Sequence, residues 1–437
     1  MTVLRIKGNK ELNGKVAISG SKNAGLALLS AVILGDGNFI FENVPQIKDI
    51  KHKLGLLELL GAKYAWNGSS LDVDCTEIIS DDEEKANIPQ TRTSFNLLGP
   101  LVARTGKAVI PTPGGCNIGA RPVDFHLKGL AALGIDIELK NGHYHAFTDR
   151  LKGAEIYLDF PSTGATQHLM STACLAEGTT IIHNAALEPE IITLSEFLNK
   201  MGARVEGAGT STITITGVTS LDGCTYRVLP DRLQASTFLI AGAITRGDVA
   251  VEGILPEHLT AITNKLKETE AKISEGPDWV RIQAPEKLKG IKVKTMPYPG
   301  FPTDIQQPTA ALLATAKGTS IVEETIYEGR IGHIAELNRM GAKITLEGRA
   351  SVIEGSKNIN GATVEASDLR AGAALCLAGL AATGETIVKN VHLIDRGYED
   401  FEYHLNSLGA DIERIELDNS PKAEKLASSS QSSENSS

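Results

Sequence analysis

The sequence predicts an α/β protein of two domains, each built from three copies of one structural unit. Three observations lead to this prediction. The chain has 437 residues, more than one hydrophobic core usually serves. Two sequence landmarks recur at intervals of about 70 residues, which indicates internal repetition. Helix-like and strand-like segments alternate within each copy, as in α/β proteins.

The first landmark is a short pattern, such as LLGAKY at 59–64, that follows a helix-like segment. A glycine directly after such a segment typically ends a helix. The central position is glycine in five copies and glutamate in one: Gly61, Gly134, Gly202, Glu270, Gly341 and Gly409.

The second landmark is a run rich in alanine and leucine that ends in glycine and is followed by a strand-like segment. These glycines are Gly37, Gly106, Gly178, Gly247, Gly318 and Gly384. Helices that are apolar on most faces are buried. One unit is therefore expected to be a buried helix, a strand, a second helix and a hairpin, with turns at Asn67-Gly68 and Asn141-Gly142.

Composition excludes several classes of protein. The formal net charge is −10 and no basic block stands out, which argues against nucleic-acid binding. No apolar run is long enough to cross a membrane, and the first residues lack the apolar core of a signal peptide. The five cysteines form no CxxC pair, so neither a zinc site nor a disulfide framework is expected, and a reducing cytoplasm fits.

One position of the repeat, the start of the first helix, bears a charged side chain in most copies. Counting back 14 or 15 residues from each glycine of the second landmark reaches the start of the first helix. The N-terminus of a helix attracts anions and disfavours cations. Cations there indicate an anionic ligand between the domains. The six residues are Lys22, Arg92, Gly164, Arg232, Asp304 and Arg370.

Several segments, taken together, resemble one enzyme family. The resemblance extends over about residues 1–416, in order and without large gaps, and it is to UDP-N-acetylglucosamine 1-carboxyvinyltransferases, a family of enolpyruvyl transferases. The loop around Cys116 and the DRGYE segment are its most specific parts. The segments are SGSKNA (19–24), PGGCNIGARPVD (113–124), PSTGAT (161–166), EPEI (188–191), VLPDR (228–232), FPTD (301–304), SDLRA (367–371) and IDRGYE (394–399).

The resemblance implies two inside-out α/β domains of three units each, with the substrate cleft between them. It also implies that the first residues of the chain complete the C-terminal domain. We therefore expect an N-terminal domain at 21–229 and a C-terminal domain at 1–20 plus 230–418. Residues 419–437 are rich in serine and are expected to be disordered.

The resemblance further implies the reaction. The family transfers the enolpyruvyl group of phosphoenolpyruvate to the 3-hydroxyl of UDP-N-acetylglucosamine and releases phosphate. This is the first committed step of peptidoglycan synthesis, and hence of cell wall biogenesis, and it is the step that fosfomycin blocks. No metal or organic cofactor is implied, and the oligomeric state stays open.

Site residues follow from the matching motifs. The resemblance gives Cys116, on a glycine-hinged lid, the role of proton donor and places Asp304 beside the reacting hydroxyl. It places Lys22, Arg121 and Arg396 at the phosphate end of phosphoenolpyruvate, and Arg330, Arg370 and Arg396 around its carboxylate. The positions that match UDP-sugar contacts are Asn23, Arg92, Arg121, Pro122, Val123, Asp124, Phe125, Ser162, Thr163, Asp304 and Ile326.

Five positions depart from the family's usual residues, and they keep other functions open. One alternative is an enolpyruvyl transferase that acts on another nucleotide, and another is a catalytically silent regulator that binds UDP-sugar. A 5-enolpyruvylshikimate-3-phosphate synthase would share the fold, but that family lacks the cysteine loop. The departures are Asn96, Phe160, Thr193, Gln234 and Gly329.

Overall fold

The structure is a computed structural model that describes residues 1–79, 92–114, 123–356 and 359–417. The predicted lid with Cys116, Arg121 and Pro122, and the serine-rich segment 419–437, lie outside the described residues. Among the residues that are described, no helix is long and apolar enough to cross a membrane.

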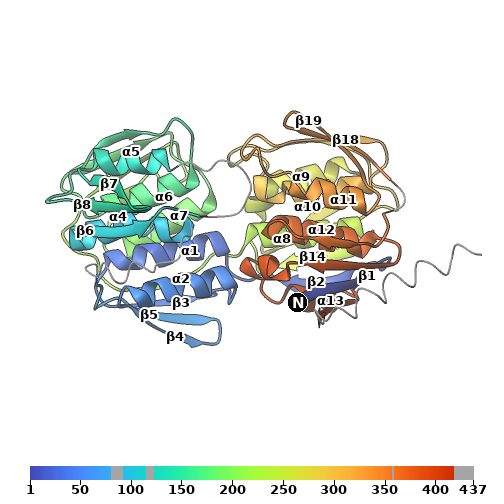
Figure 1. Ribbon diagram of the computed structural model, residues 1–437, viewed down its shortest axis with the longest axis horizontal. Helices are drawn as coiled ribbons and strands as arrows, with labels where there is room; N and C mark the ends of the chain where they lie inside the picture. Colours follow the sequence, from blue (N-terminus) through green and yellow to red (C-terminus); the bar gives the residue numbers. More distant parts are fainter. Residues whose placement is uncertain (80–91, 115–122, 357–358, 418–437) are drawn as a thin grey trace, which may run out of the picture.

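Two separate hydrophobic cores divide the molecule into two lobes (Figure 1). One core is drawn from residues between Ala24 and Val228. The other combines Leu4 to Ile18 with Leu233 to Ile412. This division supports our proposal of domains at 21–229 and at 1–20 plus 230–418.

The described residues form six sheets, of which five have four strands and one has three. The sheet of the first unit shows the common plan. Strand β13 (Thr225–Arg227) runs parallel to β3 (Asn38–Glu42), which pairs with the antiparallel hairpin of β4 (Lys63–Asn67) and β5 (Ser70–Asp74). The three-stranded sheet is β6 (Lys107–Pro111), β8 (His143–Phe147) and β7 (Asp136–Lys140), in that order.

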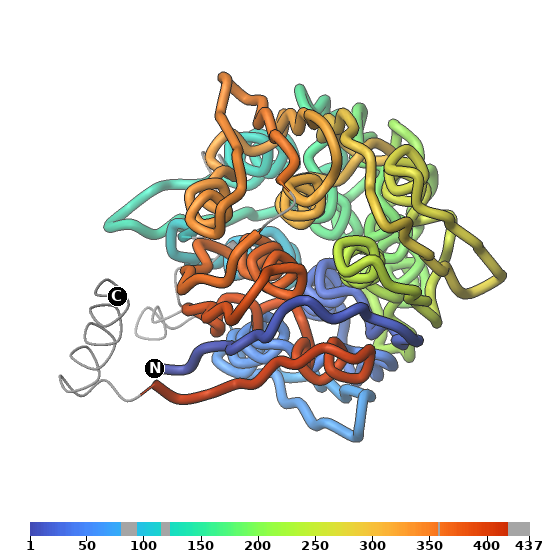
Figure 2. Tube along the Cα trace, turned by 90° about the vertical axis from the view of Figure 1, so that its right-hand side faces the viewer, coloured from blue at the N-terminus to red at the C-terminus, as the bar shows by residue number. Residues whose placement is uncertain are grey.

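The remaining sheets repeat this plan, and the start of the chain completes two of them (Figure 2). The other sheet of the N-terminal half has the order β11 (Arg204–Glu206), β12 (Thr212–Thr216), β10 (Thr179–His183), β9 (Glu155–Tyr157). Two sheets of the C-terminal half have the orders β15 (Lys272–Glu275), β16 (Trp279–Gln283), β14 (Asp248–Glu252), β2 (Asn13–Ala17) and β17 (Lys292–Lys294), β18 (Thr319–Glu323), β20 (Ala350–Glu354), β19 (Lys343–Glu347). The last sheet has the order β21 (Thr363–Glu365), β22 (Glu385–Lys389), β1 (Thr2–Lys7), β23 (Ile412–Glu416). Because β1 and β2 pair only with strands of the C-terminal half, the first residues belong to that half.

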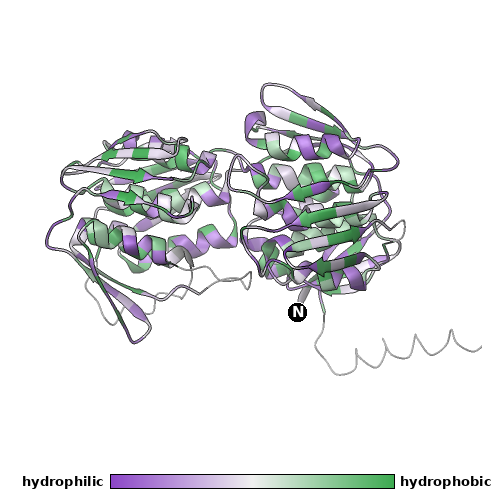
Figure 3. Ribbon diagram, turned by 90° about the horizontal axis from the view of Figure 1, so that it is seen from above, coloured by the Kyte–Doolittle hydropathy of each residue, from purple (hydrophilic) through white to green (hydrophobic). Residues whose placement is uncertain are grey.

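The first helix of each unit lies inside its lobe and the sheets lie outside, so the lobes are inside-out α/β domains as predicted. Helices α8, α10 and α12 pack on one another, while hydrophobic and hydrophilic residues alternate along the outer strands (Figure 3). The first helices are α1 (Lys22–Ala31), α4 (Leu98–Thr105), α6 (Thr163–Ala173), α8 (Arg232–Ile244), α10 (Gln306–Ala314) and α12 (Leu369–Ala381). The second helices are α2 (Lys48–Leu59), α5 (Asp124–Ala132), α7 (Pro189–Lys200), α9 (Thr260–Glu268), α11 (Gly332–Arg339) and α13 (Phe401–Ser407). Short helices complete the units: α3 (Arg92–Phe95), η1 (Val32–Leu34), η3 (Pro256–Leu259), η4 (Thr303–Ile305) and η5 (Val391–Arg396).

Both repeat landmarks coincide with residues in the left-handed backbone conformation, in which φ is positive. All six central positions of the first landmark have positive φ, including Glu270 at 74°. In the second landmark five of the six glycines do, and in the fourth unit Arg246 takes this conformation in place of Gly247. The turn at Asn141-Gly142 is confirmed, but the first hairpin turns at Gly68-Ser69, one residue later than predicted, because Asn67 still pairs with Ser70 in the ladder.

Candidate active site

A cavity of about 330 Å³ lies between the two domains and is lined by residues of both. Seven of the predicted site residues line it, and they come from three α-helices, two 3₁₀ helices and the segment after β18. These residues are Lys22, Asn23, Thr163, Asp304, Arg330, Arg370 and Arg396.

Asp304 is held by two arginines of its own domain. Its Oδ1 accepts a hydrogen bond from Arg330 Nη1 at 2.7 Å, and its Oδ2 accepts one from Arg370 Nη2 at 3.3 Å. Burial alone would raise the pKa of Asp304, but the two guanidinium groups hold that pKa well below its usual value. Asp304 is therefore held in its ionised form by Arg330 and Arg370.

Arg370 is itself fixed by a buried tyrosine. Its Nη1 donates to Tyr398 Oη at 2.8 Å, its guanidinium lies 5.2 Å from the centroid of that ring, and Tyr398 Oη is 2.8 Å from Thr237 Oγ1. Arg370 is only 2% exposed. The guanidinium is thus aimed at Asp304 by Tyr398 and Thr237, which lie on two other segments, and sequence reasoning missed both residues.

Glu324 positions the segment that leads to Arg330. Its carboxylate accepts hydrogen bonds from Thr295 Oγ1 at 2.9 Å, from Thr303 Oγ1 at 2.8 Å, and from the backbone N–H groups of Ile326 and Tyr327. Thr303 Oγ1 in turn accepts from Arg330 Nη1 at 2.9 Å. Sequence reasoning missed Glu324, because a glutamate at the end of a strand carries no local signal of such a network.

Asp49 brings two predicted cations together. Lys22 Nζ lies 3.0 Å from Asp49 Oδ2, and Arg396 Nε lies 2.8 Å from Asp49 Oδ1. Burial would raise the pKa of Asp49, but Lys22 and Arg396 hold it below its usual value. Since Lys22 and Asp49 belong to the N-terminal half and Arg396 to η5, this group connects the two halves across the cleft.

A second ion pair spans the cleft between Arg232, at the start of α8, and Glu190, on α7. The two N···O distances are 3.1 and 3.3 Å, and both side chains are almost fully buried. Arg232 also lies 5.5 Å from the centroid of the Tyr298 ring. The helix-start cation at 232 therefore meets a carboxylate of the opposite half rather than open solvent.

Five other predicted residues are not part of the cavity lining. Ser162 caps α6, where its Oγ accepts from Ala165 N–H at 3.3 Å. Val123 precedes α5, while Asp124 and Phe125 are in its first turn. Ile326 follows Glu324 and is half-buried. None of these line the cavity among the residues that the structure describes, and Arg92 is the first residue of α3.

The five departures fall in different environments. Asn96 lines the cavity, so it lies where a ligand can touch it. Gln234 Oε1 instead accepts from Ser19 N–H and Oγ–H, both at 3.1 Å, and supports the chain crossing between the domains. Thr193 is buried, Phe160 is 38% exposed, and Gly329 lies in the turn before Arg330. In the described parts of the chain no group of three or more His, Cys, Asp or Glu side chains is placed to hold a metal ion.

Comparison with known proteins shows which family this chain belongs to. The sequence matches the family described as EPSP synthase (3-phosphoshikimate 1-carboxyvinyltransferase) over residues 6–405. UDP-N-acetylglucosamine 1-carboxyvinyltransferase 2 of Carboxydothermus hydrogenoformans is 50% identical over 412 residues, which are 94% of this chain and 98% of that protein. This chain belongs to the UDP-N-acetylglucosamine 1-carboxyvinyltransferase family. The resemblance inferred from the motifs is thus confirmed.

Further relatives agree with this family. A UDP-N-acetylglucosamine 1-carboxyvinyltransferase of Finegoldia magna is 47% identical over 422 residues, 96% of this chain and all of that protein. The crystal structure of the enolpyruvyl transferase NikO from Streptomyces tendae has a TM-score of 0.86 at 26% identity and covers 95% of this chain and 99% of its own. An EPSP synthase structure from Acinetobacter baumannii covers 95% of this chain and 100% of its own, with a TM-score of 0.75 at 21% identity, and shows the shared fold.

Proposed function

We propose that this chain transfers the enolpyruvyl group of phosphoenolpyruvate to the 3-hydroxyl of UDP-N-acetylglucosamine and releases phosphate, the first committed step of peptidoglycan synthesis. One observation carries the proposal. In a chain half identical to relatives named for this activity, Lys22, Arg330, Arg370 and Arg396 converge on a single cavity. A cytoplasmic location remains a prediction from the sequence.

The cation pairs match the two anionic ends of phosphoenolpyruvate. Arginine and lysine bind phosphate and carboxylate groups through charge-assisted hydrogen bonds. Lys22 and Arg396, brought together at Asp49, take the phosphate, and Arg330 and Arg370 take the carboxylate. Each pair already contacts a protein carboxylate, so the substrate competes with Asp49 and Asp304 for the same donors.

Because of this competition, the proton affinity of Asp304 depends on whether phosphoenolpyruvate is bound. With both arginines on it, Asp304 is a weak base, because a depressed pKa means a low affinity for a proton. When the substrate carboxylate takes hydrogen bonds from Arg330 and Arg370, Asp304 regains proton affinity. The base beside the acceptor hydroxyl therefore becomes effective once phosphoenolpyruvate is in place.

The proton and bond changes then balance in two steps. In the addition, Asp304 accepts the proton of the 3-hydroxyl, the oxygen bonds to C2 of phosphoenolpyruvate, and C3 receives a proton from the thiol of Cys116. In the elimination, the C2–O bond to phosphate breaks, the departing phosphate takes the proton held by Asp304, and C3 returns a proton to the Cys116 thiolate, which restores the double bond, the thiol and the Asp304 carboxylate. The role of Cys116 rests on the family resemblance.

Phosphate release measured with three acceptors in parallel tests the proposed function. With phosphoenolpyruvate present, UDP-N-acetylglucosamine should support turnover, while shikimate 3-phosphate and UMP should not. Turnover with UMP would favour another nucleotide acceptor, for which Asn96 in the cavity is the candidate determinant. Binding of UDP-N-acetylglucosamine without any phosphate release would favour the silent regulator.

Alkylation tests the role of Cys116, because the other cysteines are poor nucleophiles. Burial raises the pKa of Cys75 and of Cys174 to about 12, and it raises the pKa of Cys376 and of half-buried Cys224. Fosfomycin, the epoxide that modifies this family's loop cysteine, should label Cys116 first and inactivate the enzyme. Cys116→Ser should block both effects, whereas Cys224→Ser, the matched control, should change neither. First labelling at any other cysteine, mapped by mass spectrometry, would contradict the assignment.

A further inference from the structure

The chain crosses between the domains directly before α1 and again directly before α8. The two crossings are hydrogen-bonded to each other. The backbone N–H of Ser21 donates to the carbonyl of Leu229 at 2.7 Å, and the backbone N–H of Asp231 donates to the carbonyl of Ser19 at 2.9 Å. The starts of α1 and α8, which belong to different domains, are therefore held side by side.

The carboxylate of Asp231 binds backbone groups of both helices. Its Oδ1 accepts hydrogen bonds from the N–H groups of Leu233 at 2.8 Å and Gln234 at 2.9 Å, and so forms the N-cap of α8. Its Oδ2 accepts a hydrogen bond from the backbone N–H of Lys22 at 3.1 Å. Asp231 is buried, with 4% of its surface exposed. One carboxylate thus joins the first turns of two helices from different domains.

The N–H of Lys22 needs such an acceptor. Lys22 is the first residue of α1, and the first N–H groups of a helix have no partner within the helix. The N-cap Ser21 satisfies a different one, since its Oγ accepts from the N–H of Ala24 at 3.3 Å. Asp231 therefore supplies, from the C-terminal domain, an acceptor that the N-cap of α1 does not provide.

The aspartate cap of α12 makes a different set of contacts. Asp368 Oδ1 accepts from the N–H groups of Arg370 at 2.9 Å and Ala371 at 3.1 Å, while its Oδ2 accepts from Gln307 Nε2 at 3.1 Å. All of these partners belong to the same domain as Asp368. The contact with the opposite domain is thus specific to Asp231 and does not follow from an aspartate cap as such.

We propose that Asp231 is a positioning residue for Lys22, which holds the start of α1 at the domain crossing so that Lys22 Nζ lies where the phosphate of phosphoenolpyruvate binds. Lys22 Nζ is 3.0 Å from Asp49 Oδ2, so its side chain is oriented by its own domain and its backbone by the other. Asp231 acts through Lys22 and is not part of the cavity lining. This inference rests on the proposed function for the identity of the ligand.

The charge of Asp231 makes positioning distinguishable from electrostatics. Asp231 interacts electrostatically with Arg232 and Arg370, which line the cavity. Removal of a negative charge near these arginines would by itself strengthen the binding of an anion. Loss of the contact with Lys22 acts in the opposite direction. Weaker phosphoenolpyruvate binding in a variant without the carboxylate therefore indicates positioning and not charge.

Hydrogen exchange of backbone amides, followed by NMR, tests the contact without any substrate. A serine at 231 can still cap α8, but it is too short to reach Lys22 as well. In Asp231→Ser the amide of Lys22 should exchange at least about tenfold faster than in the wild type, the effect of one hydrogen bond to a charged group. The amides of Ser21 and Ala24 have other acceptors and should keep their rates. An unchanged rate at Lys22, or equal acceleration of all three amides, would overturn the proposal.

Kinetics of the same variant test the positioning role. Asp231→Ser should raise KM for phosphoenolpyruvate about tenfold and change KM for UDP-N-acetylglucosamine less than about threefold. Gln234→Met is the matched control, because it removes the acceptor of Ser19 from the same crossing and leaves Asp231 in place. The control should keep both KM values within about twofold. An unchanged or lower KM for phosphoenolpyruvate in Asp231→Ser, or an equal rise in Gln234→Met, would overturn the role.

A second variant keeps the proposal testable if Asp231→Ser does not fold, as judged by circular dichroism. In Asp231→Asn the single oxygen caps α8 through two N–H groups, so the amide nitrogen faces the N–H of Lys22. The same changes in exchange and KM are expected, and wild-type exchange at Lys22 would overturn the proposal. If the wild-type protein releases no phosphate with any acceptor, the proposed function fails. Exchange of the Lys22 amide then still decides whether Asp231 holds the start of α1.

Discussion

The two domains line the same cleft but hold their charges differently. On the C-terminal side, Asp304 pairs with Arg330 and Arg370, which both belong to its own domain. On the N-terminal side, Asp49 and Glu190 depend on Arg396 and Arg232 of the opposite domain. The C-terminal wall is therefore organised without its neighbour. The N-terminal wall has only the Lys22–Asp49 pair of its own, and it has Arg396 and Arg232 as partners only while the domains are together.

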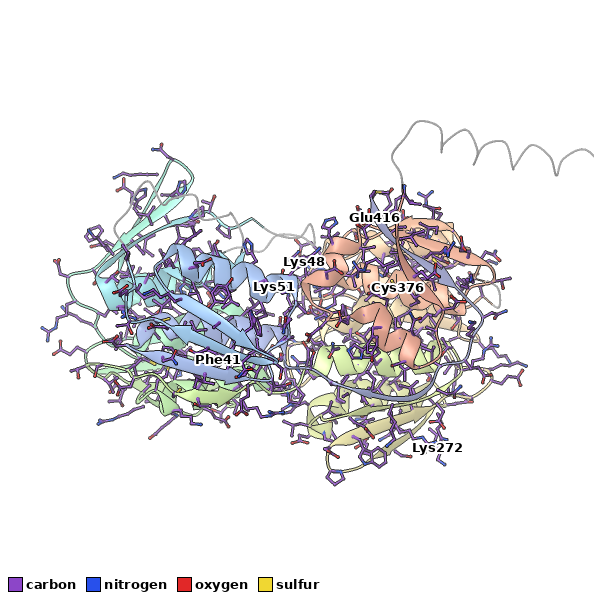
Figure 4. The ribbon with its side chains drawn as sticks, turned by 90° about the horizontal axis from the view of Figure 1, so that it is seen from below. Phe41, Lys48, Lys51, Lys272, Cys376 and Glu416 are labelled. Carbon is purple, nitrogen blue, oxygen red and sulfur yellow. The ribbon has the colours of Figure 1, made fainter. Side chains whose placement is uncertain are left out.

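This difference has a mechanical consequence. Two ion pairs join the domains across the cleft, and removing one partner of a buried pair while the domains stay closed would leave an uncompensated charge, at a cost of about 3–5 kcal/mol. A third cross-domain pair joins Lys48 to Asp395 at 2.9 Å, near the junction of the lobes (Figure 4). Lys48 is half exposed, and an exposed pair contributes little. A substrate anion that draws Arg396 from Asp49 would weaken this contact between the domains.

The largest expected effect is a difference in kcat between variants of two carboxylates, Asp304 and Asp49. Asp304→Asn should lower kcat at least about 100-fold, because the amide cannot accept the hydroxyl proton. Asp49→Asn should lower kcat less than about tenfold, because Asp49 holds cations and not the reacting hydroxyl. Steady-state kinetics of both variants, with circular dichroism to confirm folding, make the measurement.

An equal loss of kcat in Asp304→Asn and Asp49→Asn would remove the distinction between the two walls. Near-normal turnover in Asp304→Asn with unchanged thermal stability would remove the assignment of Asp304 as the base. Both variants keep side-chain size, so packing differences cannot produce either result.

The second prediction concerns the partners of Asp49. Lys22→Ala and Arg396→Ala should each weaken phosphoenolpyruvate binding about 10- to 100-fold, since a lost charge-assisted hydrogen bond costs about 1.5–3 kcal/mol. UDP-N-acetylglucosamine binding should change less than about threefold. Calorimetric titration of each substrate measures both. Equal weakening of the two ligands would indicate that these cations serve domain closure alone.

The third prediction tests closure directly. The double variant Asp49→Asn, Glu190→Gln removes the carboxylate charge from both buried cross-domain pairs, so the unliganded protein should populate a more open arrangement. Small-angle X-ray scattering should then give a larger radius of gyration than for the wild type. Glu77→Gln is the matched control, because Glu77 pairs with Lys63 on an exposed surface far from the cleft. Identical scattering of the double variant and the control would mean that other contacts keep the domains together.

The sequence was a good guide to whatever repeats and a poor guide to what pairs across the cleft. Six copies of one unit predicted the sheets, the buried helices and the helix-start cations, because periodicity and glycine positions are local signals. Asp49, Glu190 and Glu324 were missed, because a carboxylate early in a second helix or at a strand end looks like any surface residue. Their partners lie far away in sequence, as in Asp49 and Arg396. The contacts of buried His168 were missed for the same reason, since they come from a backbone N–H on α4 and a ring on α5.

The smallest expected effect tests a difference between the domains in the repeat itself. All three units of the N-terminal half have glycine at the left-handed position after the second helix, whereas the first unit of the C-terminal half has Glu270 at φ 74°. An L-residue there costs about 1–2 kcal/mol, and glycine gives back about 0.5–1 kcal/mol through its greater freedom in the unfolded chain. Glu270→Gly should therefore stabilise the protein by about 0.5–1 kcal/mol and raise Tm by about 1–4 °C.

Two features make Glu270→Gly a clean measurement. The side chain is exposed, and its pair with Lys289 is 4.0 Å long with both groups about two-thirds exposed, so almost no ion-pair energy is lost. Glu268→Gly is the matched control, because Glu268 is the last residue of α9 and has helical backbone, where glycine is unfavourable. Differential scanning calorimetry should show Tm rising in the first variant and falling in the second. A fall in both would mean that the glutamate at 270 makes a favourable contact that outweighs its backbone strain, and that this unit of the C-terminal domain differs from its five relatives by more than one turn residue.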